Sequence, residues 1–87
     1  MSNRVYIDVR NLQEVKIPIA GAVSLPYYEL LKDKESFCEL CKDAEEIILI
    51  CRSGRRSNFA RTILNKCGIE NVRVIKPSQA RKELEDA

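Results

Sequence analysis

The chain has 87 residues, 45% of them hydrophobic, which suits one domain spanning residues 1–87 with a small core. Its net charge of +2 is too small to indicate nucleic-acid binding, and no apolar run reaches the roughly 20 residues that cross a bilayer. Histidine is absent, so neither a nucleophile paired with an imidazole base nor a histidine-containing zinc site can form. We therefore expect a cytoplasmic protein that binds no membrane, metal or cofactor.

The first half of the chain has the pattern of a scaffold. Residues 4–8 are β-rich and partly alternating, which predicts a short strand. Residues 11–20 lack periodicity and contain Pro18, so a brief helical turn and a loop are expected there. Pro26 suits the first turn of a short helix that continues to about Lys32. Its buried face would contain Tyr27, Leu30 and Leu31.

A second helix is predicted over residues 37–44, with Ser36 and Glu39 in the spacing of a capping box. The side chains predicted to face inward recur at i, i+3, i+4 and i+7 and are Phe37, Leu40, Cys41 and Ala44. Cys38 and Cys41 also form a Cys-x-x-Cys sequence. A zinc site would need two more ligands, and a thioredoxin-like pair would lie at a helix N-terminus, so packing is the favoured interpretation. A resolving thiol for Cys51 remains the alternative.

The most informative stretch begins with four apolar residues, 47–50, which predict a strand buried on both faces of a parallel sheet. Cys51 follows directly, and a helix is predicted from about Arg55 to Lys66. The residues that recur on one side of this helix are Phe59, Ala60, Ile63, Leu64 and Cys67, and Gly68 suits its end. The cysteine therefore lies between a strand and a helix.

This position favours an anion, because the first N–H groups of a helix lack internal partners and carry partial positive charge. Arg52, Arg55 and Arg56 would add to the same effect, so Cys51 is expected to ionise below the free-thiol value of about 8.5. Gly54 allows positive φ, which lets successive N–H groups point into the loop. A buried structural cysteine is the alternative, but it would not require three arginines, a glycine and serines such as Ser53 beside it.

The C-terminal part completes an α/β pattern. Residues 71–75 predict a strand, and strand, helix and strand in succession imply a right-handed crossover in a parallel sheet. Pro77 and Ser78 offer the start of a closing helix through Glu85, with Ser78 as its cap.

At Cys51-Arg52-Ser53-Gly54-Arg55-Arg56 the sequence resembles the rhodanese family of sulfurtransferases, whose active loop places an arginine five positions after the cysteine. Protein tyrosine phosphatases and related enzymes place it six positions after, where this chain has Ser57. The resemblance therefore favours sulfur over phosphate chemistry. It implies that Cys51 is the nucleophile and that residues 52–56 bind the substrate.

Two further segments extend the resemblance. Asp8-Val9-Arg10 matches a family signature in which the acidic and basic side chains brace the adjoining loops, although an ordinary exposed ion pair is the alternative. Residues 21–26 resemble a segment in which Gly-Ala leads into a short strand before a proline. The chain departs from the family at Pro18 and Ser24, and at Pro77-Ser78, where a double glycine and a nearby tryptophan are usual.

These observations predict an α/β fold: a three-layer rhodanese-like domain with a central parallel sheet of about four strands and helices on both faces. The resemblance implies a sulfurtransferase in which a Cys51 persulfide carries sulfur from a small donor such as thiosulfate to a thiol or cyanide. Asp8 and Arg10 would support the site. The alternatives are a sulfur carrier acting with a sulfur-relay protein, a phosphatase or arsenate reductase, and a binding module without catalytic activity.

Overall fold

The computed structural model describes residues 3–85. Their elements, in chain order, are β1 (Arg4–Asp8), the 3₁₀ turn η1 (Leu12–Glu14), β2 (Val23–Ser24), α1 (Tyr27–Lys32), α2 (Lys34–Cys41), β3 (Glu46–Ile50), α3 (Arg55–Lys66), β4 (Val72–Ile75) and α4 (Pro77–Glu85). None of the helices within residues 3–85 has the length and apolar character that crossing a bilayer requires.

The strands form one parallel sheet in the order β2-β1-β3-β4. Ile7 pairs with Leu49, and Leu49 pairs with Val74, so the apolar run of β3 lies at the centre of the sheet. Residues 47–50 are completely buried, as a strand covered on both faces requires. The carboxyl ends of all four strands meet at one edge, and Cys51 follows β3 at this edge.

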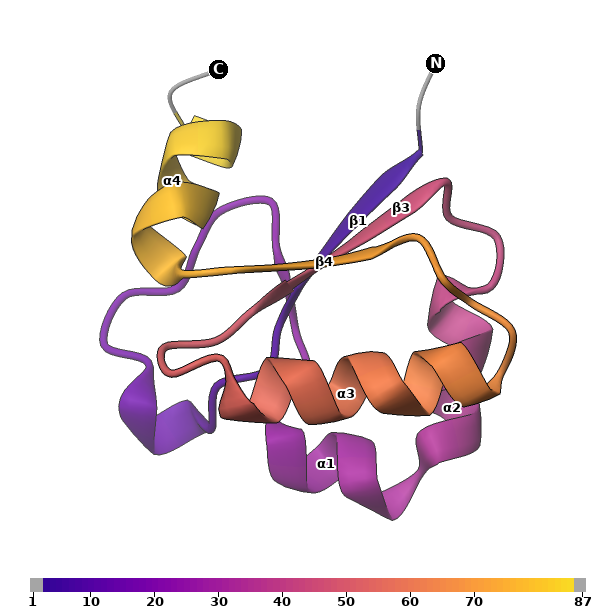
Figure 1. Cartoon of the computed structure of the whole chain (residues 1–87). Helices are drawn as coiled ribbons and strands as arrows, with labels where there is room; N and C mark the ends of the chain where they lie inside the picture. The colour runs from indigo at the N-terminus through magenta and orange to yellow at the C-terminus, as the bar shows by residue number, and fades with distance from the viewer. Residues whose placement is uncertain (1–2, 86–87) are drawn as a thin grey trace.

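Helices cover both faces of the sheet, as predicted (Figure 1). Alternate side chains of β1 and β3 point to opposite faces because a strand has a period of two. Ile7, Ile47 and Leu49 pack toward α1, α2 and α3 in the larger core cluster, which also contains Phe37 and Leu64. On the other face, a smaller cluster joins Tyr6, Ile48, Ile50 and Ile75 to Ala80 of α4.

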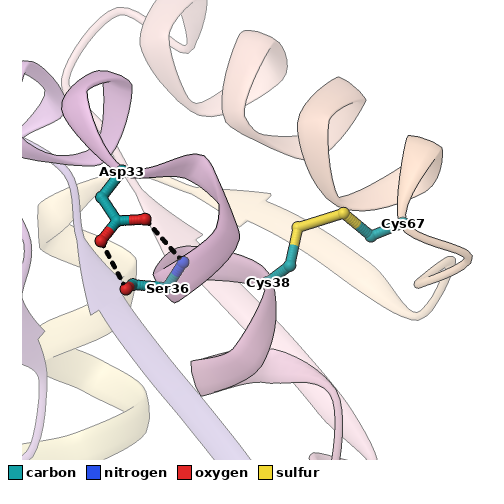
Figure 2. The surroundings of a disulfide bond; sticks show 4 residues. All are labelled: Asp33, Ser36, Cys38 and Cys67. Atoms are coloured by element: carbon teal, nitrogen blue, oxygen red, sulfur yellow. Dashed lines mark hydrogen bonds between the residues drawn. A yellow bond between two sulfur atoms is a disulfide. The ribbon is translucent and has the colours of Figure 1, made fainter.

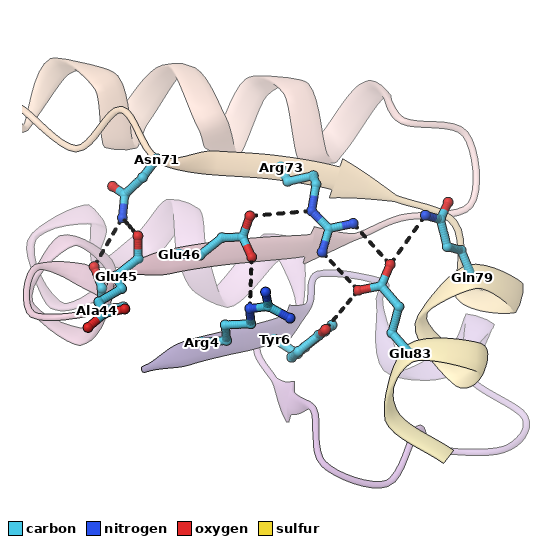
Figure 3. A network of polar contacts seen from close by, with 9 residues as sticks. All are labelled: Arg4, Tyr6, Ala44, Glu45, Glu46, Asn71, Arg73, Gln79 and Glu83. Carbon is cyan, nitrogen blue, oxygen red and sulfur yellow. Dashed lines mark hydrogen bonds and ion pairs between the residues drawn. The ribbon is translucent and has the colours of Figure 1, made fainter. Parts of the chain in front are cut away.

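A polar network joins α4 to the face of the sheet that contains the smaller core cluster (Figure 3). Glu83 accepts hydrogen bonds from the Tyr6 hydroxyl at 2.7 Å and from the Arg73 guanidinium at 2.8 and 2.9 Å. The Arg73 side chain also approaches Glu46, at 3.6 Å. These bonds hold the pKa of Glu83 at about 2, well below its ordinary value, chiefly because of Arg73. On this face, the hydrogen bonds of the Glu83 carboxylate therefore hold α4 to the sheet in addition to the small apolar cluster.

Several predicted helix details differ from the structure. The second helix begins at Lys34 and ends at Cys41, because Asp33 and not Ser36 is its N-cap. Asp33 accepts a bond of 3.0 Å from the Ser36 amide and one of 2.6 Å from the Ser36 hydroxyl (Figure 2). Helix α4 likewise begins at Pro77, so Ser78 lies inside its first turn.

The helix faces that were predicted to be buried are wider than the faces that are buried in the structure. Four side chains that were expected to pack inward are substantially exposed instead: Leu31, Leu40, Phe59 and Cys67. Helix α3 buries Ser57, Ala60, Ile63 and Leu64, which form a narrower stripe. The Phe59 ring lies beside this stripe and meets Tyr27 edge to face, with 6.2 Å between ring centroids. A small domain has few neighbouring elements to cover the margins of a helix.

The prediction that Cys38 and Cys67 only pack in the core was wrong. A disulfide joins them, connecting the middle of α2 to the C-cap of α3 (Figure 2). Cys41 is a free thiol with no exposed surface, in agreement with the packing interpretation for that residue.

Candidate active site

Cys51 is the first residue after β3 and is only 3% exposed. Its amide donates to the Ile75 carbonyl at 3.2 Å, which continues the pairing between β3 and β4 up to the cysteine. On the other side of β3, Asp8 of β1 is in register with Ile50. The Val9 amide donates to the Ile50 carbonyl at 3.1 Å, so the pairing with β1 also reaches the end of the strand. The sheet therefore holds the Cys51 backbone firmly in place.

The loop from Cys51 to the start of α3 curls its backbone around the cysteine sulfur. Burial by itself raises the pKa of the Cys51 thiol. Backbone N–H groups that hydrogen-bond to the sulfur together outweigh this effect, so the pKa lies below the ordinary value. These donors belong to Ser57, Gly54, Ser53 and Arg56. A thiolate that accepts several amide bonds is the arrangement expected of a reactive cysteine.

Gly54 makes this curl possible. Its φ is +83°, and it is the N-cap of α3. Asn58 closes the turn, because its amide and its side-chain Nδ2 both donate to the Gly54 carbonyl, at 2.9 and 2.7 Å. The Arg55 amide also donates to the Ser53 hydroxyl at 3.4 Å. The first turn of α3 is thereby fixed with its free N–H groups directed at the cysteine.

Asp8 and Arg10 form a buried pair at the end of β1. The Arg10 guanidinium donates to the Asp8 carboxylate through Nε at 2.9 Å and through Nη2 at 2.7 Å, and both side chains are less than a tenth exposed. The pKa of Arg10 is raised, chiefly by the hydrogen bonds to Asp8, and the negative charge of Cys51 contributes to the rise. Arg10 therefore has a fixed positive charge within electrostatic reach of the Cys51 sulfur.

The three loop arginines differ in their surroundings. Arg56 pairs with Glu14 of η1, and its guanidinium carbon lies 5.9 Å from the centre of the Tyr27 ring. Arg52 and Arg55 are exposed. A cavity of about 530 Å³ opens over the loop and is lined by Glu14, Cys51, Arg52, Ser53, Arg55 and Arg56. A second cavity, of about 290 Å³, reaches Cys51 from the side of β4 and the start of α4.

The structure thus brings together every residue that the sequence analysis assigned to the loop, and it adds others. The Ser57 amide is a further donor to the Cys51 sulfur. The sequence could have indicated it, because the first N–H groups of a helix have no partner within the helix. The Ser57 hydroxyl is completely buried and has no hydrogen-bond partner within residues 3–85. Glu14 could not have been found from sequence, because it lies 42 positions before Arg56 and in a turn without periodicity.

The remaining cysteines differ from Cys51 in position or in chemical state. Cys67 is at the far end of α3, whose 12 residues extend roughly 18 Å at 1.5 Å per residue. Cys38 is bonded to Cys67, and burial raises the pKa of Cys41 to about 11. Cys38 therefore has no free thiol with which to resolve Cys51, and the raised pKa of Cys41 disfavours the thiolate that such a reaction requires.

A parallel α/β sheet in which a cysteine with a lowered pKa lies between a central strand and the start of a helix defines the class of protein to which this chain belongs. Residues 1–78 match the family model described as Rhodanese-like domain, so the chain belongs to the rhodanese-like domain family. Over 67 residues it is 37% identical to a protein of Bacillus subtilis (strain 168) named "Putative sulfur carrier protein YrkF". That match covers 76% of this chain and 34% of YrkF, so the chain spans about a third of the relative's length.

Solved structures show the same fold. A rhodanese-related protein from Thermoplasma volcanium superposes with a TM-score of 0.69 at 28% identity, covering 93% of this chain and 78% of that protein. The Saccharomyces cerevisiae single-domain sulfurtransferase RDL2 superposes with a TM-score of 0.64 at 19% identity, covering 95% of this chain and 77% of RDL2. The predicted family and fold are thereby confirmed.

Proposed function

We propose that the protein transfers sulfane sulfur through a persulfide on Cys51, with thiosulfate as a competent donor and a thiol or cyanide as acceptor. The observation that supports this most strongly is the ring of amides around Cys51, which lowers the pKa of a buried thiol. The family membership and the named sulfur carrier among the relatives agree with this chemistry.

The reaction has two displacement steps. The Cys51 thiolate attacks the outer sulfur of thiosulfate, the sulfur–sulfur bond of the donor breaks, and sulfite leaves with the electron pair. The persulfide anion, Cys51–S–S⁻, then remains in the amide ring. In the second step, an acceptor thiol or cyanide attacks the outer sulfur, and the Cys51 thiolate leaves with the electron pair. No net oxidation occurs, and no external electron acceptor is needed.

The surrounding residues have distinct roles in this proposal. The amides of Ser53, Gly54, Arg56 and Ser57 stabilise negative charge on the cysteine and on its persulfide. Arg52 and Arg55 line the cavity with exposed guanidinium groups and would bind the departing sulfite through charge-assisted hydrogen bonds. Arg56 is held by Glu14, so we assign it mainly to the shape of the loop. Asp8 and Arg10 hold the end of β1 beside the site.

Intact-mass analysis after incubation with thiosulfate tests the proposal. We expect one added sulfur on the wild type, its removal by cyanide as thiocyanate, and no added sulfur on Cys51→Ser. Cys41→Ser is the matched control and should load like the wild type. An added sulfur on Cys51→Ser, or none on the wild type, would refute the assignment.

A carrier function is the second candidate, because YrkF is named as a sulfur carrier. The two functions differ in turnover. A sulfurtransferase should form thiocyanate continuously from thiosulfate and cyanide, whereas a carrier should be loaded by another protein and release one sulfur per molecule. Aryl phosphate hydrolysis that disappears in Cys51→Ser would instead support the phosphatase alternative, against which the loop spacing argues.

A further inference from the structure

The cavity over the Cys51 loop continues into a second surface hollow. The second hollow has a volume of about 330 Å³ and is lined by Arg10, Glu14, Lys16, Ile17, Arg52, Pro77 and Arg81. Arg52 and Glu14 line both hollows, so the two hollows adjoin each other. We call the combined surface the track; it runs from Cys51 toward α4. Cavities of roughly 300–1,000 Å³ hold drug-sized ligands, and a small inorganic anion would fill only part of this track.

The track is strongly basic. Within residues 3–85, Lys16, Arg52 and Arg55 have no carboxylate at ion-pair distance. Arg81 is 4.0 Å from Glu85 and donates to the Ile17 carbonyl at 3.0 Å. The acidic residue of the track, Glu14, is already paired with Arg56. The charges that remain available to a ligand on this surface are therefore positive.

The opposite edge of the sheet has exposed charges of both signs. Asp43, Glu45 and Glu70 are exposed in the segments that precede β3 and β4, and so are Lys42 and Lys66. On the track beside Cys51, by contrast, the unpaired charges within residues 3–85 are all positive. Such a group of cations attracts a negatively charged partner toward the cysteine before contact.

The nature of the lining favours a polypeptide over a nucleic acid. Among the described residues that line the two hollows, none is aromatic, so bases would find no stacking surface. Ile17 is 66% exposed at the track and offers apolar contact to a side chain. Cys51 is 3% exposed, so its sulfur can be reached only by a slender group such as a cysteine side chain on an extended segment.

We propose that this track binds an extended acidic segment of a partner protein, and that a cysteine in the segment accepts the outer sulfur from Cys51. The proposal rests on the proposed function and specifies its acceptor. The acceptor thiol attacks the outer sulfur of Cys51–S–S⁻, the bond to the Cys51 sulfur breaks, and the Cys51 thiolate leaves with the electron pair. The thiol proton stays on the product, which departs as a persulfide of the partner.

Single-turnover transfer to synthetic acceptors tests the proposal. The wild type is loaded with thiosulfate, freed of excess donor and mixed with a peptide in which glutamate residues surround one cysteine, with the same peptide carrying glutamine, or with 2-mercaptoethanol. We expect transfer to the acidic peptide to be about tenfold faster than to the glutamine peptide at low salt, and the difference to shrink at high salt. Equal rates for the two peptides would overturn the proposal.

Charge-reversal variants test whether the track is the surface that accelerates transfer to the acidic peptide. In Lys16→Glu/Arg81→Glu, the ratio of the rate with the acidic peptide to the rate with 2-mercaptoethanol should fall about tenfold. Lys34→Glu/Lys66→Glu is the matched control, because it changes the net charge equally at exposed positions outside the track. Lys16→Glu alone leaves the bond from Arg81 to Ile17 in place and should give a smaller fall in the same ratio. An equal fall in the control would contradict the assignment of the surface.

A binding measurement separates this proposal from the proposed function. Fluorescence anisotropy of the acidic peptide with serine in place of cysteine reports on the track without any sulfur chemistry. Binding by the wild type that weakens in Lys16→Glu/Arg81→Glu supports the surface even if thiosulfate fails to load Cys51. An oligothymidylate that displaces the peptide at equal charge concentration, or no binding at all, would overturn it.

Discussion

Cys41 and Cys51 are both free, both buried and both part of the same hydrophobic cluster, yet their thiols have opposite properties. Burial raises the pKa of Cys41 to about 11, while the pKa of Cys51 is lowered. Cys41 ends a helix, where carbonyls and not N–H groups are free, and Cys51 lies before the start of one. The comparison teaches that the direction in which the nearby peptide groups point, and not burial, decides which cysteine is reactive.

The reactivity of the two thiols should differ most. At pH 7 the pKa of about 11 leaves Cys41 almost entirely protonated, so we expect Cys51 to react with iodoacetamide at least about 100-fold faster in the folded protein. The Cys51 rate should fall as the pH drops through its lowered pKa, because the thiolate is then protonated. Peptide mapping after timed alkylation measures both rates. Similar rates at the two sites would show that the amides do not act on Cys51.

Substitution by serine should separate the two sites in stability. Cys41→Ser buries a hydroxyl in apolar surroundings and should lower the free energy of unfolding by about 1–3 kcal/mol. Cys51→Ser places the hydroxyl among amide donors and should cost less than about 1 kcal/mol. Urea unfolding of both variants, with the Cys38–Cys67 bond intact, gives the comparison. A larger loss for Cys51→Ser would mean that its surroundings do not satisfy a polar atom.

Gly54 and Gly68 provide a matched test of the loop geometry. Their φ values are +83° and +84°, and an added Cβ would meet only Asn58 Nδ2 at 3.6 Å near Gly54 and nothing within 4 Å near Gly68. Alanine at either position should cost about 1–2 kcal/mol in the free energy of unfolding through backbone strain. Gly54→Ala should also raise the alkylation midpoint of Cys51, because its amide is one of the donors. A rise in Gly68→Ala would indicate a general loss of structure instead.

The smallest effect is expected for Arg56→Met. Its guanidinium is engaged by Glu14 and lies over Tyr27, so its removal should raise the alkylation midpoint of Cys51 less than Gly54→Ala does. Glu14→Gln frees Arg56 while keeping a similar shape and serves as the companion variant. If Arg56→Met shifts the midpoint more than Gly54→Ala, the side-chain charge, and not the backbone, would be the main cause of the lowered pKa.

Much of the fold was accessible from sequence because its central strand is strongly apolar and both ends of α3 carry glycine signals, although the caps predicted at Ser36 and Ser78 were wrong. The run at residues 47–50 predicted β3, and Gly54 and Gly68 bracket α3 as predicted. The width of the helix faces was not accessible, since Phe59 and Leu40 satisfy the periodicity of a buried face but lie at its margin. Periodicity indicates the direction of burial, whereas the packing of neighbouring elements sets how far burial extends.

In the candidate site, too, the features set by consecutive residues could be predicted, whereas the long-range contacts could not. Cys51, Gly54 and the neighbouring serines could be selected because their chemistry depends on a few consecutive residues. The pairing of Arg56 with Glu14 and the bond between Cys38 and Cys67 join positions that are distant in the chain, and no local pattern indicates them. Long-range contacts of this kind depend on how α3 and η1 are placed against the sheet.

The bond between Cys38 and Cys67 also closes a covalent ring whose ends are 29 positions apart in the sequence. This ring contains β3, the whole Cys51 loop and α3. Cross-linking a segment of this length reduces the conformational entropy of the unfolded chain by an amount worth about 3–4 kcal/mol. A backbone cut at the exposed arginines of the loop would leave the two halves joined. The reactive segment is therefore the part of the molecule whose ends are covalently tied together, even though the bond itself lies at the opposite end of α3.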